Sequence, residues 1–389
     1  MFDFTTVPNR RGGDSIKWSG PEKELPMWIA DMDFQTAPAV IEALQQKVAT
    51  GIFGYEEPPR EYFQAVSDWY ETRHQTAIPL DWQLFATGVI PALSASIRRV
   101  TNAGDNVVVQ TPVYNMFFNS IENAGRHVLP AELAYDRATH TYHIDWDGLE
   151  SALAEPLTTA MVVCNPHNPI GQIWTRDELT RIAELCKQNG VTLIADEIHG
   201  DLTLNGHEYT PTFSLPEALR QNLITLVSPS KAFNLAAIHA ATVIVSNPTL
   251  RANIARGLGV YEVNEPNLTA IPASIAAYTK GAEWFDALRQ QLNANLQTVQ
   301  QFDLGDAIVT PATANYLLWL DISAYTHDSA KLADFLETKV GLKLNAGSDY
   351  RGNGHDFLRL NIACPQALLQ DGLTRLQQGL NLYRKDFND

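Results

Sequence analysis

The 389-residue chain has few cysteines, few cations and no long apolar run. Its three cysteines, Cys164, Cys186 and Cys364, are odd in number and lack metal-ligand spacing, which argues against a disulfide framework and a metal centre. The net charge of −16 disfavours nucleic acid and anionic membranes as main partners. No apolar run approaches the roughly 20 residues that cross a bilayer, and the N-terminus does not resemble a secretory signal. We therefore expect a cytoplasmic protein that acts on a small molecule.

Strand-like and helix-like segments alternate between residues 84 and 247. This alternation predicts an α/β fold, in which a mostly parallel central sheet carries helices on both faces. Residues 265–300 favour a long helix or a helix pair that bridges two lobes, and the residues after 300 favour a smaller α+β lobe. We predict an N-terminal arm that is part of the small domain (1–45), a large domain (46–285) and a small C-terminal domain (286–389).

Local signals predict the ends of individual elements. Thr36 is a suitable N-cap for a helix over 37–48, and Thr175 for a helix over 176–190, where Gly190 fits the C-terminal end. The apolar segment 25–34 leaves two interpretations open. It is either an arm that passes the active site or a strand that packs on the small lobe.

Two strand ends carry the residues that suggest chemistry. The apolar run 223–227 predicts a buried strand, and it is followed by Ser228, Ser230 and Lys231. The strand within 191–196 ends at Asp196, with His199 three residues later. A surface lysine is the ordinary interpretation of Lys231 alone. An amine and an acid at two strand ends are, however, the pair that pyridoxal phosphate needs, because the amine holds the aldehyde and the carboxylate keeps the pyridine nitrogen protonated.

Further candidates lie at other turns, and each has a structural alternative. Gly88 precedes a helix whose first N–H groups, at Val89 and Ile90, can bind an anion. Asn168 either belongs to a plain Asn-Pro turn or binds the cofactor ring oxygen, and Tyr114 is either a core aromatic or stacks on the ring. Arg359 lies in an apolar strand, so it either forms a structural ion pair or clamps a carboxylate.

Taken together, these motifs resemble the fold-type I pyridoxal-phosphate enzymes and, more narrowly, the MalY/PatB group of cystathionine β-lyases and related C–S lyases. The resemblance runs nearly end to end. It rests on motifs that occur in the family's order: MFDF at the start, IADMDF (29–34), FGYEEPP (53–59), TPVYN (111–115), NPHNPIG (165–171), IADEIHGD (194–201), SPSKAFN (228–234) and FLRLNIACP (357–365).

The resemblance implies roles for these positions. Lys231 would hold the cofactor and move the proton at the substrate Cα, Asp196 would pair with the pyridine nitrogen, and Arg359 would clamp the substrate carboxylate. The remaining implied cofactor contacts are Asn168 and His199 near the ring oxygen, Tyr114 on the ring face, Val89, Ile90, Ser228 and Ser230 at the phosphate, and Tyr55 from the partner subunit of a homodimer.

The implied reaction is α,β-elimination from L-cystathionine and related cysteine S-conjugates, which yields a thiol, pyruvate and ammonia. The alternatives are an aminotransferase and a regulatory protein built on the same scaffold. Two positions depart from the pattern. Relatives often carry an arginine eight residues after the lysine, where this chain has His239, which implies weaker cofactor binding. Relatives often have Pro-Gly in the turn that reads NAGSDY here (345–350), which affects substrate preference.

Overall fold

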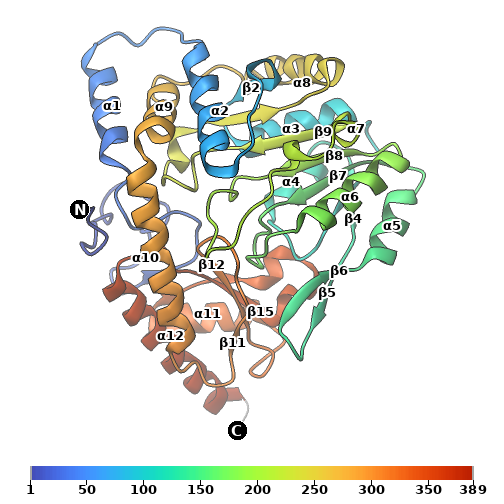
Figure 1. The fold of residues 1–389 in the computed structure, drawn as a ribbon. Coiled ribbons are helices and arrows are strands. Elements are labelled where there is room, and N and C mark those ends of the chain that lie inside the picture. The colour runs from blue at the N-terminus through green and yellow to red at the C-terminus, as the bar shows by residue number, and fades with distance from the viewer. Residues whose placement is uncertain (1, 388–389) are drawn as a thin grey trace.

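The structure, a computed structural model, describes residues 2–387, and a seven-stranded sheet forms the centre of its large lobe (Figure 1). Neighbouring strands run parallel except at β10, which is antiparallel to both of its neighbours. In spatial order the strands are β2 (Gln83–Ala86), β10 (Ala241–Ile244), β9 (Leu223–Val227), β8 (Thr192–Asp196), β7 (Thr158–Cys164), β3 (Asn106–Val109) and β4 (His127–Pro130).

Helices cover both faces of this sheet, and for this reason its central strands are apolar throughout. All five residues of β9, for example, are buried. One face packs in a core with α3 (Val89–Val100), α4 (Met116–Glu122) and α8 (Pro248–Val260). The other face packs with α5 (Trp146–Ala154), α6 (Arg176–Gln188) and α7 (Glu217–Arg220). The predicted α/β fold with a mostly parallel sheet is confirmed.

The small lobe contains a four-stranded antiparallel sheet and two long helices. Its strands, in spatial order, are β11 (Ile308–Val309), β12 (Leu317–Asp321), β15 (Phe357–Asn361) and β14 (Asn345–Ala346), and its helices are α11 (Ser329–Val340) and α12 (Gln366–Phe387). A hairpin of the large lobe, β5 (Leu133–Asp136) and β6 (Thr141–Ile144), reaches this lobe, where the Tyr135 hydroxyl donates to Asp321 (2.7 Å).

A helix pair joins the two lobes, as the sequence predicts for residues 265–300. Helix α9 (Ala270–Lys280) packs on α1 (Pro38–Ala49) and α2 (Arg60–His74), and α10 (Ala282–Gln301) continues from it into the small lobe (Figure 1). The predicted domain division stays a prediction, and α1 and α10 run across its two boundaries. Within residues 2–387, no helix combines the length and apolar character needed to cross a membrane.

Segment 25–34 combines both interpretations that the sequence leaves open. Its first residues form β1 (Leu25–Pro26), which pairs in parallel with β13 (Leu342–Lys343) of the small lobe. The chain then passes between the lobes, where the Met32 amide donates to Asn234 (2.9 Å) of the large lobe. The segment is therefore a small-lobe strand that continues into an arm along the inter-lobe junction.

The two predicted helix caps had different outcomes. Thr175 forms a full capping box with Glu178 at the start of α6, as predicted. Thr36 does not cap α1, whose N-cap is Ala37 without any side-chain hydrogen bond. The Thr36 hydroxyl donates instead to the Phe233 carbonyl (2.7 Å), because a tertiary contact with the segment after Lys231 takes the hydroxyl away from the helix end.

Candidate active site

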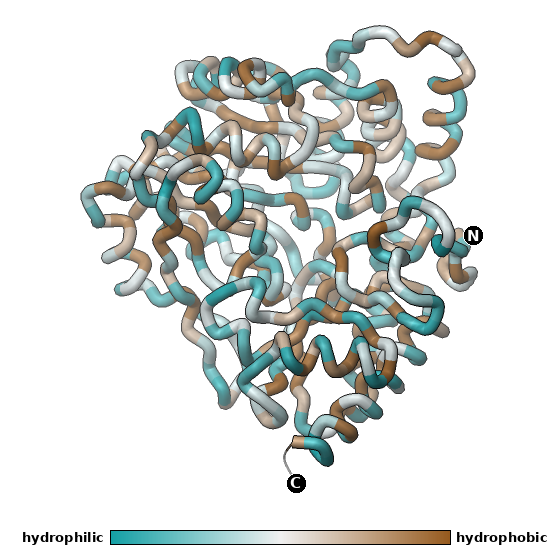
Figure 2. Tube along the Cα trace, turned by 180° about the vertical axis from the view of Figure 1, so that it is seen from behind, coloured by the Kyte–Doolittle hydropathy of each residue, from teal (hydrophilic) through white to brown (hydrophobic). Residues whose placement is uncertain are grey.

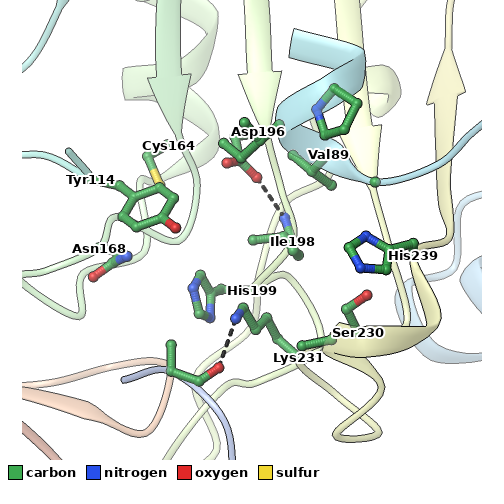
Figure 3. A pocket seen from close by; sticks show the side chains of 15 residues that line it. Val89, Tyr114, Cys164, Asn168, Asp196, Ile198, His199, Ser230, Lys231 and His239 are labelled. Carbon is green, nitrogen blue, oxygen red and sulfur yellow. Dashed lines mark hydrogen bonds between the residues drawn. The ribbon is translucent and has the colours of Figure 1, made fainter. Parts of the chain in front are cut away.

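A cavity of about 330 Å³ opens where the carboxyl ends of β7, β8 and β9 meet the start of α3 (Figure 3). Such strand ends are where open α/β sheets place their ligands. The cavity is lined by Ala30, Gly88, Val89, Ile90, Pro91, Tyr114, Cys164, Asn168, Asp196, Ile198, His199, Ser230, Lys231, Ala236 and His239.

Lys231 reaches the cavity from the turn after β9, and its amine is not a surface amine. Its Nζ donates to the Ala30 carbonyl at 2.7 Å, the lower dashed line in Figure 3. Burial lowers the pKa of this amine to about 8, and the positive charge of Arg359 acts in the same direction, against the carboxylates of Asp31 and Asp196. A lysine with a lowered pKa supplies neutral amine near neutral pH, which is what a nucleophile or base requires.

Asp196 is the last residue of β8 and is almost completely buried (3% exposed). Burial raises the pKa of its carboxyl to about 6, although the Ile198 amide, which donates to Oδ1 at 3.1 Å, and the charge of Lys231 lower it. A cation placed beside this carboxylate stabilises its charged form, because burial leaves the negative charge poorly solvated.

The start of α3 provides an anion-binding end to the cavity. Gly88 precedes the helix with φ +138°, in a region that side chains rarely adopt, and no side chain caps the first turn. The N–H groups of Val89 and Ile90 therefore stay available beside the cavity. Figure 3 shows Ser230 and His239 on this side, opposite Tyr114 and Asn168.

Arg359 connects the small lobe to the other side of the cavity. Its guanidinium donates to the side chains of Asn168 (3.0 Å) and Asn345 (2.8 Å) and to the Trp28 carbonyl (2.9 Å). Its Nε has no hydrogen-bond partner in the described part of the chain, residues 2–387. No carboxylate lies within 4.0 Å of this guanidinium among residues 2–387, so the alternative of a structural ion pair is wrong. A buried cation held only by neutral oxygens is suited to an incoming carboxylate.

The NAGSDY turn lies against this arginine. Asn345 accepts a hydrogen bond from Arg359, and the ring of Tyr350 lies 5.0 Å from the guanidinium carbon. Tyr114 contributes to the same region, and burial raises the pKa of its hydroxyl, partly offset by the charge of Arg359.

Of the remaining predicted residues, His199 lines the cavity, whereas Ser228 and Tyr55 do not. His199 lines the cavity without a hydrogen bond to Asp196, and burial, reinforced by the charges of Lys231 and Arg359, lowers its pKa to about 3. Ser228 is buried behind Ser230, and its hydroxyl donates to the Ala240 carbonyl (2.6 Å). It therefore does not line the cavity.

Tyr55 lies outside the cavity altogether. It is fully exposed, in the loop that joins α1 and α2 and forms an arch at the edge of the molecule (Figures 1 and 2). The neighbouring Ile52 and Phe53 are 73% and 67% exposed, and Figure 2 shows one short hydrophobic stretch in this otherwise pale or hydrophilic loop. A single chain therefore does not bring Tyr55 to the site.

Some residues of the site region have no counterpart among the predicted ones. Cys164 lines the cavity at the end of β7, and Ala30 supplies a backbone carbonyl, which leaves no signal in a sequence. Glu197, next to Asp196, is buried and accepts from the Tyr209 hydroxyl and the Thr212 amide. The acidic pair in the DEIH motif could have signalled it, since one of two adjacent strand-end acids must point away from the cavity.

Glu197 predicts a measurable pH dependence of stability. Burial raises the pKa of its carboxyl from 4.5 to about 7, against the hydrogen bonds from Tyr209, Thr212 and Asn165. Between these two pH values the folded protein keeps a proton that the unfolded chain releases. The free energy of unfolding therefore falls as pH rises through this window, by up to about 3 kcal/mol from Glu197. We expect Glu197→Gln to remove this part of the decrease in urea titrations at a series of pH values.

The matched control for this measurement is Glu208→Gln, which removes one carboxylate from an exposed position nearby. It should leave the pH dependence of stability as in the parent protein. A Glu197→Gln variant whose stability still falls as steeply as that of the parent protein would contradict the assignment.

Comparison with known proteins agrees with this geometry. The family model described as aminotransferase class I and II matches residues 24–376. The chain is 38% identical to cystathionine beta-lyase PatB of Bacillus subtilis, covering 98% of this chain and 100% of PatB, and 34% identical to protein MalY of Escherichia coli, covering 99% and 100%. Its structure is similar to that of cystalysin from Treponema denticola, which contains pyridoxal 5′-phosphate (TM-score 0.93, 30% identity, 98% and 99% coverage). The chain belongs to the class I and II aminotransferase family.

Proposed function

We propose that the protein is a pyridoxal-phosphate-dependent C–S β-lyase that cleaves L-cystathionine and related cysteine S-conjugates. The observation that carries the proposal is the group of three charged residues around one cavity. The Lys231 amine and the Asp196 carboxylate line it, and the Arg359 guanidinium, which has no carboxylate partner among residues 2–387, bonds Asn168 in its wall. The similarity to PatB and MalY over nearly the whole chain supports the reaction class.

The residues of the cavity fit the proposed cofactor part by part. The start of α3, with Ser230, matches a phosphate, and Asp196 matches a protonated pyridine nitrogen. Tyr114 offers a flat ring face, and Asn168 offers an amide to the ring oxygen. The buried Nδ1 of His199 has no hydrogen-bond partner among residues 2–387, so a polar atom of a bound molecule would satisfy it. Ser228 can contribute only through Ser230, since the two Oγ atoms lie 2.8 Å apart.

When bound, the cofactor supplies an electron sink for the pair of electrons left on the substrate Cα. Lys231 is the residue that moves the proton, because its amine lines the cavity and burial lowers the pKa of this amine to about 8. Asp196 keeps a proton at the pyridine nitrogen, and without this proton the electron sink is weak. Arg359 binds the substrate carboxylate and so orients the Cα–H bond toward Lys231.

Elimination then follows from the chemistry of the substrate. Loss of the Cα proton to Lys231 leaves an electron pair that expels the thiolate from Cβ. The three-carbon product hydrolyses to pyruvate and ammonia, and L-cystathionine yields homocysteine as the thiol. Transamination begins with the same proton abstraction but needs a keto acid to accept the amino group, which makes the two reactions distinguishable.

The deciding experiment follows both products from purified protein with pyridoxal phosphate and L-cystathionine. We expect equal amounts of pyruvate and free thiol, formed without any keto acid. Product that forms only when a keto acid is present would make the protein an aminotransferase. Bound cofactor with no turnover of any thioether would favour a regulatory protein on the same scaffold.

The histidine at position 239 leads us to expect weaker cofactor binding than an arginine there would give. We expect His239→Arg to lower the dissociation constant for pyridoxal phosphate by about fivefold, because an imidazole is replaced by a guanidinium that can make bidentate, charge-assisted hydrogen bonds to a phosphate. Titration of the apoprotein with the cofactor, followed by fluorescence, measures this constant. The control is His207→Arg, which adds the same charge outside the cavity. Unchanged or weaker binding by His239→Arg would place the phosphate elsewhere.

We also propose that the enzyme works as a cytoplasmic homodimer with shared active sites. The exposed apolar side chains of Ile52 and Phe53, next to the fully exposed Tyr55, support this proposal, because a second copy would cover them. In that arrangement Tyr55 would reach the phosphate end of the partner's cavity. Sedimentation of the holoenzyme, together with cofactor titration of Tyr55→Phe, tests it. A monomer with unchanged cofactor affinity would overturn the proposal.

A further inference from the structure

The segment from Trp28 to Phe34 is held in place almost entirely by side chains of other elements. Its carbonyl oxygens accept from several polar side chains, and three of these donors, from both lobes, bond the carbonyls on either side of Ala30. Arg359 donates to Trp28 (2.9 Å), Asn361 donates to Ile29 and Asp31 (2.7 Å each), and Asn234 donates to Met32 (3.0 Å) and Phe34 (2.9 Å). Such a set of bonds fixes where each carbonyl points.

Four charged residues add a second restraint on the same segment. Arg10 contacts Asp31 (2.6 Å) and Asp33 (2.8 Å), and Lys17 contacts Asp33 (2.8 Å) and Asp31 (3.5 Å). The side chains of Lys17 and Asp33 are 1% and 2% exposed, and the Trp18 ring N–H also donates to Asp33 (2.7 Å). We call Arg10, Lys17, Asp31 and Asp33 the arm cluster. Its two cations and two carboxylates neutralise one another. Removal of one member would leave a charge without its partner in a poorly solvated place, which is destabilising.

The product of these restraints is the position of one carbonyl in the active site. Ala30 lies between Ile29 and Asp31, the two residues whose carbonyl oxygens accept from Asn361. Its oxygen accepts from the Lys231 amine (2.7 Å) and from the buried Tyr316 hydroxyl (3.1 Å). A neutral amine that donates one N–H to a fixed acceptor has its lone pair oriented as well. The Ala30 carbonyl therefore sets the direction in which Lys231 can take a proton.

We propose that the arm cluster is a positioning device for catalysis, which holds the Ala30 carbonyl against Lys231 so that the free amine stays aligned with the substrate Cα. The inference rests on the proposed lyase function. Arg10, Lys17, Asp31 and Asp33 are positioning residues in this scheme, because none of them lines the cavity. Substitution of these residues should therefore slow the proton-transfer step and leave substrate binding nearly unchanged.

The test uses the cofactor-loaded enzyme and the variant Arg10→Gln. Arg10 is the member of the arm cluster with the most exposed side chain (24%), and its loss leaves Asp31 with Lys17 alone at 3.5 Å. We expect kcat for L-cystathionine to fall by about tenfold or more with KM within about twofold of the parent value. Arg10→Lys, which keeps the charge, should recover most of kcat. Amide hydrogen exchange, which needs no turnover, should be faster at Met32 and Asp33, whose amides are bonded to Asn234 and Ala363.

The control is Arg73→Gln, which removes a comparable arginine–aspartate pair, to Asp286 (2.6 Å), between α2 and α10 and away from the cavity. It should change neither kcat nor exchange in the arm. Faster exchange in Arg10→Gln with an unchanged kcat, or a rise in KM alone, would overturn the inference. A parent enzyme that eliminates nothing from L-cystathionine would instead overturn the proposed function, and unchanged exchange at Met32 and Asp33 would then count against the arm cluster on its own.

Discussion

Lys231→Ala is expected to lower kcat for elimination from L-cystathionine by about 10⁴-fold or more, because it removes the base that we propose moves the Cα proton. The proposed carboxylate site at Arg359 and the start of α3 are unchanged, so the variant should still fold and bind pyridoxal phosphate. Quenched-flow measurement of pyruvate gives the rate, and the visible spectrum shows whether the lysine-linked form of the cofactor is lost.

One further variant and one rescue experiment distinguish the loss of the base from the loss of its charge. Lys231→Arg keeps a cation in the cavity but has no neutral amine near pH 8, so it should be as inactive as the alanine variant. A small external amine should restore part of the activity of Lys231→Ala, since the space of the side chain is then free. Lys280→Ala, which removes an exposed lysine at the end of α9, is the control. Retention of more than a tenth of the parent rate in Lys231→Ala would show that another group takes the proton.

The strand ends that carry Lys231 and Asp196 are predictable because they depend on local pattern. Apolar runs bounded by Ser, Pro and Asp identify β9 and β8, and the alternation with helices forces both strands into one sheet with the same direction. Parallel strands bring their carboxyl ends to one edge, so the amine and the acid have to be neighbours. The same logic identifies the start of α3, where Gly88 supplies a conformation that other residues avoid.

The contacts that position the Arg359 side chain and the arm are not predictable in this way, because they join residues far apart in the chain. The sequence leaves both an ion pair and a carboxylate clamp open for Arg359, since one of its partners, the Trp28 carbonyl, lies more than three hundred positions away. Ala30 acts through its backbone, so its side chain gives no signal. Thr36 shows the opposite failure, in which a good local cap signal loses to a tertiary hydrogen bond with Phe233.

Asp196→Asn is expected to lower kcat by about 10²–10³-fold with little effect on the fold. Asparagine has nearly the same shape, and its oxygen can still accept from the Ile198 amide, so only the negative charge is lost. Without that charge a bound cofactor would not keep its pyridine nitrogen protonated, and the electrons released at Cα would have a poorer sink. The measurement is kcat at saturating cofactor, with bound cofactor determined after dialysis. The matched control is Glu197→Gln, which removes the adjacent carboxylate outside the cavity and should stay within about threefold of the parent kcat.

The same variant should also change how cofactor binding depends on pH. Burial raises the pKa of Asp196 to about 6, so below this pH the apoprotein carries a neutral acid that must lose its proton before it can pair with a cation. Cofactor affinity of the parent protein should therefore weaken as pH falls below 6, by up to about tenfold per pH unit. Asp196→Asn has no proton to lose, so the difference between the two binding curves isolates this residue from every other group that titrates. Parallel curves for the two proteins would mean that Asp196 does not face the ring nitrogen, and the assignment of the electron sink would fail with it.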